Sequence, residues 1–450
     1  MVDSVTFRAS LGLDQRVERR HTVVLGAGLS GLSTCLHLCG DYLVLEREGR
    51  PGGLARTESY DGFLFDVTGH WLHLRDERTK ALVARLLGDG LVSVERKAAI
   101  YVHRTFTRYP FQANLYGLPG PVLRECLRGA VEAAVRRARG GTQRLKTFLD
   151  YVHYHFGPGI ANHFIVPYNT KLFGVSPAEV TAEWTGRYIP VPDILEVVDG
   201  ALGFSKEAMG YNATFLYPRE NGIEALPRAM FACLDRERFL FNTRPRKIHL
   251  GERYVEFGDE RVTFEHLVST IPLPELVAVT EDAPPAIRRA AQRLRCSELR
   301  YMNVGLSVPR PLNGLHWIYL PEDRFPFYRV GSASNVLSLV APQGMSSLYV
   351  ELRNDRREED RAVVRALADF LKEIGTIERE AQLLFASFRR HPYGYVIFDR
   401  YCTRARSLIM SFFDAHGVHS IGRYGGWTYN SMEDAILDGI RSAEAILARS

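Results

Sequence analysis

Residues 22–31 read Thr-Val-Val-Leu-Gly-Ala-Gly-Leu-Ser-Gly, and this stretch decides the fold. A short apolar strand pattern runs directly into three glycines with the spacing GxGxxG. An apolar helical pattern at residues 29–38 follows. A second strand pattern at residues 42–45 ends at Glu46, 20 residues after Gly26. This order of strand, glycine turn, helix, strand and acid predicts an α/β domain of the Rossmann type.

Each glycine of the turn has a different structural role in such a strand–turn–helix motif. Gly26 permits the tight turn, Gly28 lets the backbone approach a pyrophosphate, and Gly31 lets helix and strand pack closely. The helix then points free N–H groups and its positive end at the pyrophosphate. Glu46 stands where an acid accepts hydrogen bonds from ribose hydroxyls. The turn therefore predicts a dinucleotide cofactor, and these residues alone leave FAD and NAD open.

Length and composition bound the class of protein. The chain has 450 residues, enough for roughly two to four domains. Hydrophobic residues make up 46% and charged residues 24%, which excludes a mainly disordered chain. No apolar run reaches the length of about 18 residues that a transmembrane helix needs. We therefore expect a globular protein without an integral membrane segment.

The cysteines and the net charge indicate the redox environment of the protein and the partners that it can bind. The six cysteines are scattered and form no CxxC pair, so neither a disulfide framework nor a metal site is expected. Residues 1–20 lack the apolar stretch of a signal peptide. Together these features predict a reducing, cytoplasmic setting. The net charge of +5 comes from basic residues interleaved with acids, which argues against a nucleic-acid partner.

A second glycine pair, Gly52 and Gly53, follows Glu46. Near the other end of the chain, a further glycine segment at residues 422–427 precedes a helical pattern at residues 431–447. These segments, with residues 65–70, resemble the flavoproteins that include amine oxidases, protoporphyrinogen oxidases and sugar mutases. In such proteins the C-terminal glycine segment returns to the flavin, and the last helix closes the domain.

This resemblance implies FAD as the cofactor, active in its reduced form, with NADPH or NADH as the reductant. It also implies that both ends of the chain build the FAD-binding domain. The residues implied to hold FAD are Gly26, Gly28, Ser30, Gly31, Glu46, Arg47, Gly53, Leu54, Gly69, Gly422, Arg423 and Ser431.

Four stretches in the middle of the chain resemble one branch of these flavoproteins, the UDP-galactopyranose mutases, especially their eukaryotic type. They lie at residues 109–112, 167–174 with 184–187, 212–222, and 317–329. The last is the most specific, because other branches of the superfamily do not carry it. Together with the FAD segments, the resemblance covers most of the chain from about residue 21 to the end.

The resemblance implies an enzyme that interconverts UDP-galactopyranose and UDP-galactofuranose. In that branch, reduced flavin N5 attacks the anomeric carbon and UDP leaves, so the cofactor divides a hard step into easier ones. A diphosphate leaving group suits arginine, because a planar guanidinium matches phosphate oxygens in pairs. The residues implied to be catalytic are Arg187, Arg329, His70 and Tyr429.

The resemblance also implies a set of substrate contacts. Uridine needs a flat hydrophobic surface and amide groups, which residues 109–112 with Asn169 would supply. Tyrosine hydroxyls would contact phosphate or sugar. The residues implied to bind substrate are Tyr109, Phe111, Gln112, Asn169, Asn212, Tyr319 and Tyr395.

The sequence departs from the mutase branch at several positions. Val336 stands where eukaryotic members carry a tyrosine near the sugar, Phe173 where many carry tryptophan, and Thr68 where a glycine is usual. Because these changes cluster toward the sugar, a mutase for a different nucleotide sugar is an alternative. An oxidoreductase of the amine-oxidase or protoporphyrinogen-oxidase type is another, since the glycine motifs fit it equally well. A flavin-binding protein without catalysis is the third.

The expected architecture has three regions. The FAD-binding domain combines residues 20–90, 222–290 and 396–450, with strands at 247–250, 254–257, 261–264 and 266–271. A helical domain at residues 113–200, with one helix over 144–155, is expected to cover the active site. An antiparallel sheet domain for the substrate combines residues 92–111, 204–217 and 300–389.

Two loops in the helical domain are candidates for movement. They are Gly157-Pro158-Gly159 and Val191-Pro192-Asp193, which would close over bound substrate and exclude water. The sequence also leaves a homo-oligomer open.

Overall fold

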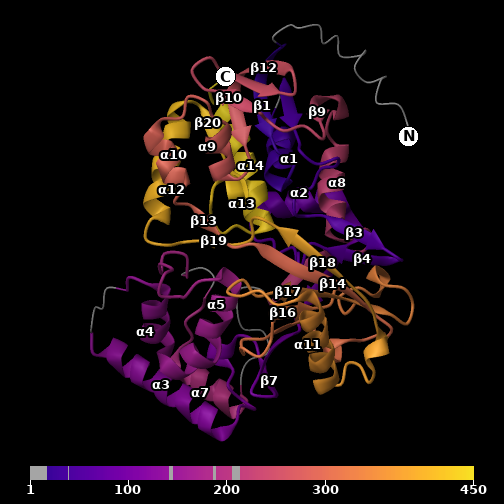
Figure 1. The fold of residues 1–450 in the computed structure, drawn as a ribbon, viewed down its shortest axis with the longest axis vertical. Coiled ribbons are helices and arrows are strands. Elements are labelled where there is room, and N and C mark those ends of the chain that lie inside the picture. The colour runs from indigo at the N-terminus through magenta and orange to yellow at the C-terminus, as the bar shows by residue number, and fades with distance from the viewer. Residues whose placement is uncertain (1–17, 39, 141–144, 186–188, 205–212, 450) are drawn as a thin grey trace.

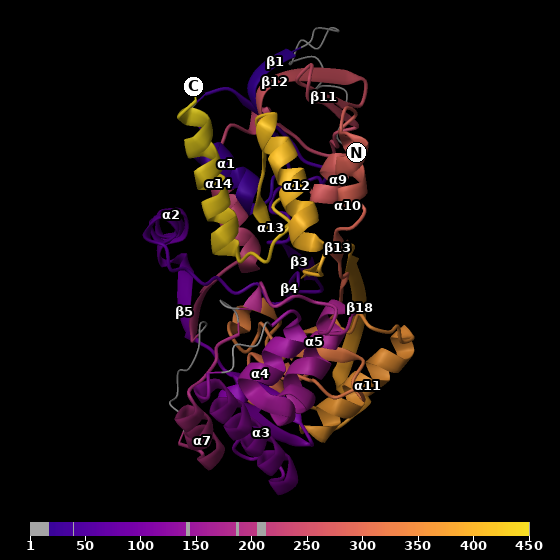
Figure 2. The same ribbon diagram turned by 90° about the vertical axis from the view of Figure 1, so that its left-hand side faces the viewer.

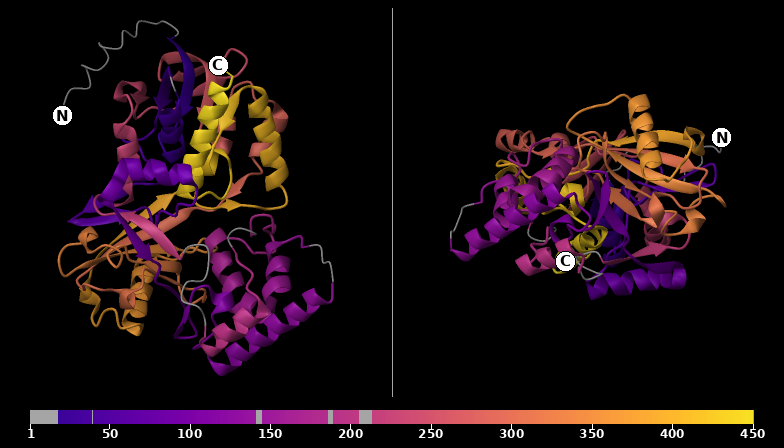
Figure 3. Two further views of the ribbon diagram at one scale, coloured as in Figure 1. Left: turned by 180° about the vertical axis from the view of Figure 1, so that it is seen from behind. Right: turned by 90° about the horizontal axis from the view of Figure 1, so that it is seen from below.

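The computed structural model describes residues 18–38, 40–140, 145–185, 189–204 and 213–449. Figure 1 shows an upper domain that contains both ends of the described chain. Below it lie a sheet on one side and a group of helices on the other. Figure 3 shows the same arrangement from behind and from below, with the helices beside the sheet.

The upper domain is built on a seven-stranded sheet. Its parallel strands are β1 (Glu18–Leu25), β2 (Tyr42–Leu45), β9 (Phe239–Leu240), β12 (Glu260–Ser269) and β20 (Val418–Ser420). The antiparallel strands β10 (Lys247–His249) and β11 (Tyr254–Phe257) extend it. The strands expected at 261–264 and 266–271 are one strand, β12, because both segments pair along β1.

Helices cover both faces of this sheet (Figure 2). One core holds α1 (Leu29–His37), α2 (Glu77–Leu87), α8 (Ala225–Ala232) and α14 (Met432–Leu447). The other core holds α9 (Leu273–Val279), α10 (Pro285–Ala291) and α12 (Cys402–Ala415). The short helix α13 (Gly422–Gly425) leads into α14. This two-sided covering of a parallel sheet confirms the predicted α/β Rossmann-like class.

The C-terminal helix α14 lies tightly against α1. Gly439 makes this possible, because a Cβ atom there would sit 2.5 Å from the carbonyl oxygen of Ser30. Ser431 caps α14, and Asp434 completes a capping box. The last helix therefore lies beside the glycine turn near the start of the described chain, as the resemblance implied.

The lower sheet also has seven strands. In spatial order they are β18 (Leu383–His391), β14 (Leu299–Leu306), β17 (Ser346–Leu352), β16 (Phe327–Gly331), β15 (Trp317–Tyr319), β6 (Ala98–Val102) and β7 (Thr105–Arg108). All neighbours are antiparallel except β15 and β6. The predicted antiparallel sheet is therefore present, with one parallel pair.

Alternation along the strands gives the lower sheet two different faces. On one face, apolar side chains such as Met302 and Val304 pack on α11 (Asp360–Glu373). The other face carries Tyr301, Asn303, Tyr349 and Glu351. This second face lies against the upper domain, because a Cβ at Gly69 would come within 2.6 Å of the Tyr349 hydroxyl.

The group of helices contains α3 (Gly120–Ala138), α4 (Phe148–Ile160), a π-helical turn (Ala161–Ile165), α5 (Val166–Phe173) and α7 (Ile194–Leu202). The helix expected over 144–155 begins later, because Thr147 caps it. It also continues farther, through residues 157–159.

The prediction that residues 157–159 form a moving loop is wrong. Gly157 has a φ of 75° and forms a kink inside α4. A Cβ at Gly157 would meet the Gly129 carbonyl oxygen of α3 at 2.1 Å, and one at Gly159 would meet Glu125 at 2.5 Å. These glycines allow two helices to touch, so close packing explains them. The other predicted loop precedes α7, where Asp193 is the capping residue.

Three strand pairs connect the larger parts. They are β3 (Thr57–Tyr60) with β4 (Phe63–Asp66), β5 (Leu91–Glu95) with β8 (Thr214–Pro218), and β13 (Arg295–Cys296) with β19 (Val396–Ile397). β8 pairs with β5 and does not join the seven-stranded lower sheet, where residues 204–217 were expected. The boundaries of the three predicted domains stay predictions.

Short 3-10 turns complete the described chain. They lie at Gly88–Gly90, Phe111–Ala113, Gly222–Glu224, Arg236–Arg238, Leu312–Gly314, Ser338–Val340 and Glu380–Gln382. Within the described residues, no helix has the length and apolar character needed to cross a bilayer.

Candidate functional site

The glycine turn follows β1 and leads into α1. Gly26 has a φ of 99°, and a Cβ there would strike the Thr270 hydroxyl oxygen at 2.3 Å. A Cβ at Gly31 would lie 2.0 Å from the Gly26 carbonyl oxygen. Packing within the protein therefore requires glycine at both positions.

Gly28 is different, because no atom of the described residues crowds it. A Cβ at Gly28 would find its nearest neighbour, the Gly53 Cα atom, at 3.8 Å. The peptide after it begins α1, and Gly52 pairs with Gly28 in a parallel bridge. A glycine that packing does not require, at the start of a helix, is suited to close approach by a pyrophosphate. The residues present therefore fit a dinucleotide cofactor.

Glu46 lies at the end of β2, 6% exposed. Its carboxylate accepts hydrogen bonds from the backbone N–H groups of Ala27 (2.6 Å) and Glu48 (2.8 Å). These bonds hold the carboxylate next to the glycine turn, where an acid can meet ribose hydroxyls. Arg47 is the neighbour of Glu46 and forms an ion pair with Glu48 at 3.2 Å.

The C-terminal glycine segment returns to the same turn. A Cβ at Gly422 would come within 2.6 Å of the Ser30 hydroxyl oxygen. Arg423 donates to the carbonyl oxygens of Asn430 (2.8 Å) and Gly394 (3.2 Å). Ser431 uses its hydroxyl to cap α14, and Leu54 packs with Val67 beside the lower sheet. The structure thus brings these implied FAD residues to one end of the upper domain.

Several buried polar atoms near this end have no hydrogen-bond partner among the described residues. They are His70 Nδ1, Asn303 Oδ1, Trp317 Nε1 and Glu351 Oε2. Buried polar atoms are normally paired, so unpaired ones at a shared location indicate a place for a polar ligand. All four lie on, or next to, the face of the lower sheet that meets the upper domain.

His70 lies close to the charged part of this site. The pKa of His70 is lowered to about 4, chiefly by burial; a hydrogen bond with the Val67 backbone opposes this shift, and the charges of Arg423 and Arg329 contribute to it. The imidazole is therefore neutral at pH 7 and acts through its hydrogen-bonding nitrogens. Gly69 before it has no room for a side chain, as noted above.

Arg329 is held by a buried carboxylate. Its Nε donates to Glu351 Oε1 at 2.8 Å, and its Nη2 lies 2.6 Å from the same oxygen. Nη2 also donates to the Tyr395 hydroxyl at 3.4 Å. Burial is the largest single effect and opposes the charge of Arg329, but the attraction of Glu351 and of the neighbouring tyrosine hydroxyls together outweighs it and raises the pKa of Arg329 above its usual value. The side chain of Arg329 is 20% exposed, whereas that of Glu351 is 0% exposed.

Tyrosine rings gather around Arg329. Tyr109 stacks on Tyr319 with centroids 5.0 Å apart, and Tyr395 stacks on Tyr429 at 6.0 Å. The guanidinium of Arg423 lies 5.2 Å from the Tyr395 ring and 4.9 Å from the Tyr429 ring. Burial raises the pKa of Tyr395 and Tyr429, so both keep their proton and can donate hydrogen bonds.

We call this group the tyrosine–arginine chamber; it consists of Tyr109, Tyr319, Arg329, Glu351, Tyr395, Arg423 and Tyr429. Trp184 contacts it from the helices, with its ring centroid 6.1 Å from that of Tyr429. Trp184 Nε1 is buried and has no partner among the described residues. The chamber therefore joins side chains of the upper domain and the lower sheet, and the helices adjoin it through Trp184.

Other implied substrate residues lie deeper in the helices. Phe111 is 0% exposed and stacks on Phe164 at 5.2 Å. The amide of Gln112 donates to the Pro190 carbonyl oxygen at 3.1 Å. The amide of Asn169 donates to the Ile165 carbonyl oxygen at 2.7 Å within its own helix. Their roles toward uridine stay predictions, as do those of Arg187 and Asn212, which lie outside the described residues.

Sequence reasoning missed Glu351 and did not select Trp184 as a site residue. Glu351 is the single carboxylate in the otherwise apolar or small strand β17, Ser346–Leu352, and is fully buried. An isolated acid in a buried strand is a signal that a cation lies opposite. Which of the many arginines pairs with it depends on the sheet register, in which Glu351 is the partner of Arg329.

A glycine cradle, an acid after the second strand and a returning C-terminal segment define a flavoprotein of the dinucleotide-binding type. The sequence matches the family described as flavin containing amine oxidoreductase over residues 29–447. The chain belongs to this family, and the predicted class of flavoprotein is confirmed.

Solved structures share the fold. A reduced UDP-galactopyranose mutase has 23% identity and a TM-score of 0.90, covering 96% of this chain and 94% of its own. A putative protoporphyrinogen oxidase from Exiguobacterium sp. has 16% identity and a TM-score of 0.73, with coverage of 97% and 100%. Putrescine oxidase bound to putrescine has 14% identity and a TM-score of 0.64, with coverage of 96% and 100%. These likenesses establish the fold and leave the reaction to be argued from the site.

Proposed function

We propose that this protein is a flavin-dependent mutase that interconverts the pyranose and furanose forms of a UDP-sugar, with UDP-galactose as the first sugar to test. The observation that carries the proposal is the Arg329–Glu351 pair among tyrosine hydroxyls, beside His70 and Arg423. The likeness in fold to a UDP-galactopyranose mutase supports it.

Arg329 is suited to hold a diphosphate. Its Nε and Nη2 are engaged by Glu351 and Tyr395, whereas no described residue accepts a hydrogen bond from Nη1. A guanidinium fixed on one edge can present its other N–H groups to phosphate without losing further side-chain freedom. We propose that Arg187, which lies outside the described residues, is the second arginine of a clamp that binds the diphosphate together with Arg329.

The tyrosines would bind the leaving diphosphate as it gains charge. Tyr395 and Tyr429 are protonated at neutral pH, and each can donate one hydrogen bond to a phosphate oxygen. Donors that are already in position stabilise developing charge more than solvent does. The stacked rings also keep water away from the reacting carbon.

The flavin, when bound in its reduced form, supplies the nucleophile for the anomeric carbon. The chain's own residues hold UDP near the sugar, so that it can return after the ring has closed through another hydroxyl. His70 is neutral, and its Nδ1 has no hydrogen-bond partner among the described residues. Its imidazole can therefore form a hydrogen bond with a ligand at this site without adding charge. NADPH or NADH is proposed as the reductant.

The charge of the chamber disfavours amine oxidation. Arg329 and Arg423 are both partly buried cations, and Glu351 is already paired with one of them. A protonated amine would meet net positive charge there. The sugar itself stays open, because Val336 packs with Trp317 and Tyr319 where eukaryotic mutases carry a tyrosine.

The test is product analysis after chemical reduction of the purified flavoprotein, using UDP-galactofuranose without oxygen. Conversion to UDP-galactopyranose, absent with oxidised flavin, is the expected result. Binding of UDP without conversion would point to a different nucleotide sugar. Failure to bind UDP at all would reject the mutase and favour an oxidase, which oxygen consumption with amine substrates would then reveal.

A further inference from the structure

Lys171 is a buried cation that none of the assigned roles uses. It lies in the last turn of α5 and is 1% exposed. Its Nζ donates hydrogen bonds to the carbonyl oxygens of Leu320 (3.0 Å), Glu322 (2.5 Å) and Phe327 (3.2 Å). An ammonium group has three N–H donors, so three acceptors match it.

These carbonyls belong to one short segment, residues 320–327, which we call the β15–β16 connection. Tyr319 directly precedes Leu320, and Arg329 follows Phe327 by two residues. The ammonium therefore ties together the two ends of the segment from which both chamber residues extend. In addition, the Leu320 N–H donates to the Tyr328 carbonyl oxygen at 2.9 Å, which closes the base of the connection.

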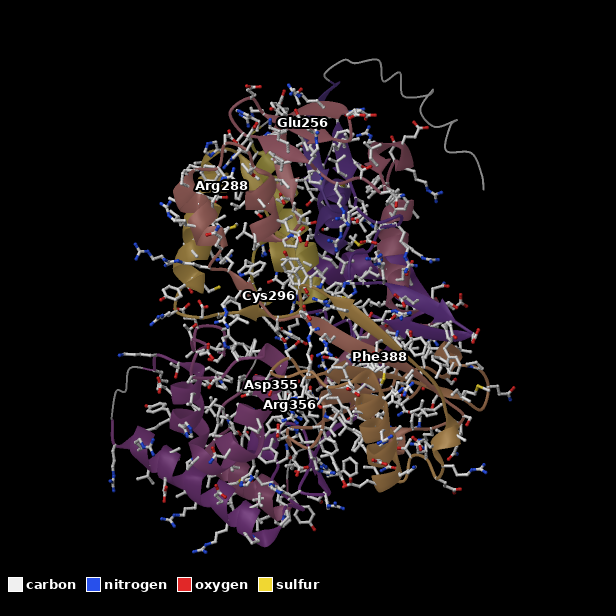
Figure 4. The ribbon with its side chains drawn as sticks, in the orientation of Figure 1. Glu256, Arg288, Cys296, Asp355, Arg356 and Phe388 are labelled. Carbon is white, nitrogen blue, oxygen red and sulfur yellow. The ribbon has the colours of Figure 1, made fainter. Side chains whose placement is uncertain are left out.

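The same end of α5 is bound to the strand that carries Glu351. The N–H of Asn354, three residues after Glu351, donates to the Lys171 carbonyl oxygen at 2.8 Å. The Asn354 side chain donates to the Leu172 carbonyl oxygen at 3.0 Å. Asp355 and Arg356, which follow it, lie where the helices meet the sheet (Figure 4). Lys171 thus sits where α5, the β15–β16 connection and the end of β17 converge.

Helix α5 also contributes to the chamber wall. The Tyr168 ring lies edge-on to Tyr319 with centroids 5.4 Å apart, and to Tyr328 at 5.8 Å. A shift of α5 against the connection would therefore change the position of Tyr319 relative to its neighbours. Lys171 lies one helical turn beyond Tyr168 and joins the two parts directly.

We propose that Lys171 is a positioning residue, which fixes Tyr319 and Arg329 relative to the helices by binding the carbonyls at both ends of the β15–β16 connection. The purpose of that positioning, holding a diphosphate, rests on the proposed function. The contact itself does not depend on it. A methionine of similar length would fill the space but would leave three buried carbonyl oxygens without their donor.

The pKa of Lys171 is lowered to about 7, chiefly by burial and in part by the charge of Arg353. Asp323, Asp355 and Glu322 act in the opposite direction. Above this pH the neutral amine has two N–H groups for three carbonyls. Positioning should therefore weaken as pH rises through 7, which separates Lys171 from a residue that only fills space.

The test compares Lys171→Met with Lys372→Met, a matched change on the exposed face of α11. Both variants are first required to bind flavin with the wild-type absorption spectrum. Hydrogen exchange is then measured for peptides that cover the β15–β16 connection, from pH 6 to pH 8.5, after correction for the intrinsic rate. We expect the connection to lose protection from hydrogen exchange above pH 7 in wild type and in Lys372→Met. In Lys171→Met it should be unprotected from pH 6 to pH 8.5.

Binding of UDP to the same holoproteins gives the second measurement. We expect Lys171→Met to bind UDP about tenfold more weakly, the effect of losing one hydrogen bond to a charged group. Wild type and Lys372→Met should lose affinity as pH rises through 7, whereas Lys171→Met should not. Wild-type protection and UDP affinity in Lys171→Met would overturn the proposal.

Two further outcomes are decisive. If Lys171→Met does not retain flavin, Lys171→Gln takes its place, and full wild-type protection of the connection in that variant would contradict the proposal. If wild type fails to bind UDP but its connection responds to pH as expected, the mutase function fails and the positioning role stands.

Discussion

The glycine cradle and the tyrosine–arginine chamber lie close together but are built in opposite ways. The cradle is mainly backbone: Gly26, Gly28 and Gly31 lie within one turn and the helix that follows it. The chamber is mainly side chain, and its members come from segments between Tyr109 and Tyr429.

This difference separates binding of the cofactor from choice of reaction. A cradle made of backbone can hold a pyrophosphate whatever side chains surround it, because the backbone N–H groups at the start of the helix make the contacts. A chamber made of side chains can change its chemistry by a few substitutions while the fold persists. The shared fold of a mutase and of oxidases, at identities of 14–23%, is consistent with this division.

The largest expected effect comes from adding a methyl group inside the cradle. Gly31→Ala places a Cβ 2.0 Å from the Gly26 carbonyl oxygen and should destabilise the fold by about 3 kcal/mol or more. Gly28→Ala, where the nearest atom is 3.8 Å away, should fold normally but bind flavin more weakly. Thermal unfolding and flavin content measure the two effects. Equal unfolding temperatures for both variants would contradict the distinction between Gly31, which packing requires, and Gly28, which leaves room for the pyrophosphate.

The second-largest effect is expected from substitutions of Arg329 in the tyrosine–arginine chamber. Arg329→Lys keeps a cation beside Glu351 but loses the planar fork, so turnover of UDP-galactofuranose should fall by about 100-fold with flavin retained. Arg329→Ala should also destabilise the protein, because it leaves the buried Glu351 carboxylate without its partner. Anaerobic kinetics and chemical denaturation separate these outcomes. Unchanged turnover in Arg329→Lys would refute the role of Arg329 in the clamp.

His70 lies at the border of the two regions, and its effect should depend on pH. Its folded pKa is about 4, below the value of about 6.5 in an unfolded chain, so its neutral form is favoured by folding. This contribution is complete above about pH 6.5 and is lost as pH falls toward 4, a change on the order of 3 kcal/mol. His70→Gln should remove that part of the acid sensitivity, as measured by denaturation of the holoprotein. If the unfolding free energy of wild type and of His70→Gln fell equally with decreasing pH, this contribution of His70 would be excluded.

The smallest effect should come from one hydroxyl of the chamber. Tyr395→Phe keeps the ring that stacks on Tyr429 and removes the group 3.4 Å from Arg329 Nη2. The affinity for UDP should fall by a factor of about five, as for one neutral hydrogen bond. Tyr60→Phe, at an exposed position of β3, provides the matched control. If Tyr395→Phe lost more affinity for UDP than Arg329→Lys does in the same assay, the Tyr395 hydroxyl, and not the Arg329 guanidinium, would be the main contact to the diphosphate.

Much of the upper domain was predictable from local patterns. Strand β2 begins and ends at the predicted residues, and helix α14 starts one residue after the predicted position. Gly157 and Gly159 show the limit of such patterns. Glycine next to proline is typical of a loop, but here it lets α4 touch α3, because the neighbouring helix leaves no room for a Cβ.

The chamber was predictable only in part. Tyr319, Arg329, Tyr395 and Tyr429 were implied by resemblance, and the structure brings them together. Phe111 was implied to contact uridine; its ring stacks on Phe164, and its role toward uridine stays a prediction. Neither Glu351 nor Lys171 was selected, because their partners are distant in the chain.

The sequence by itself determined the class of fold and the place of the dinucleotide, because both follow from residues that are neighbours in the chain. A glycine turn between a strand and a helix acts through local backbone geometry. The tertiary structure decided which carboxylate holds Arg329 and which carbonyls receive Lys171. Those contacts depend on sheet register and helix packing, which bring together residues that are 22 and about 150 positions apart.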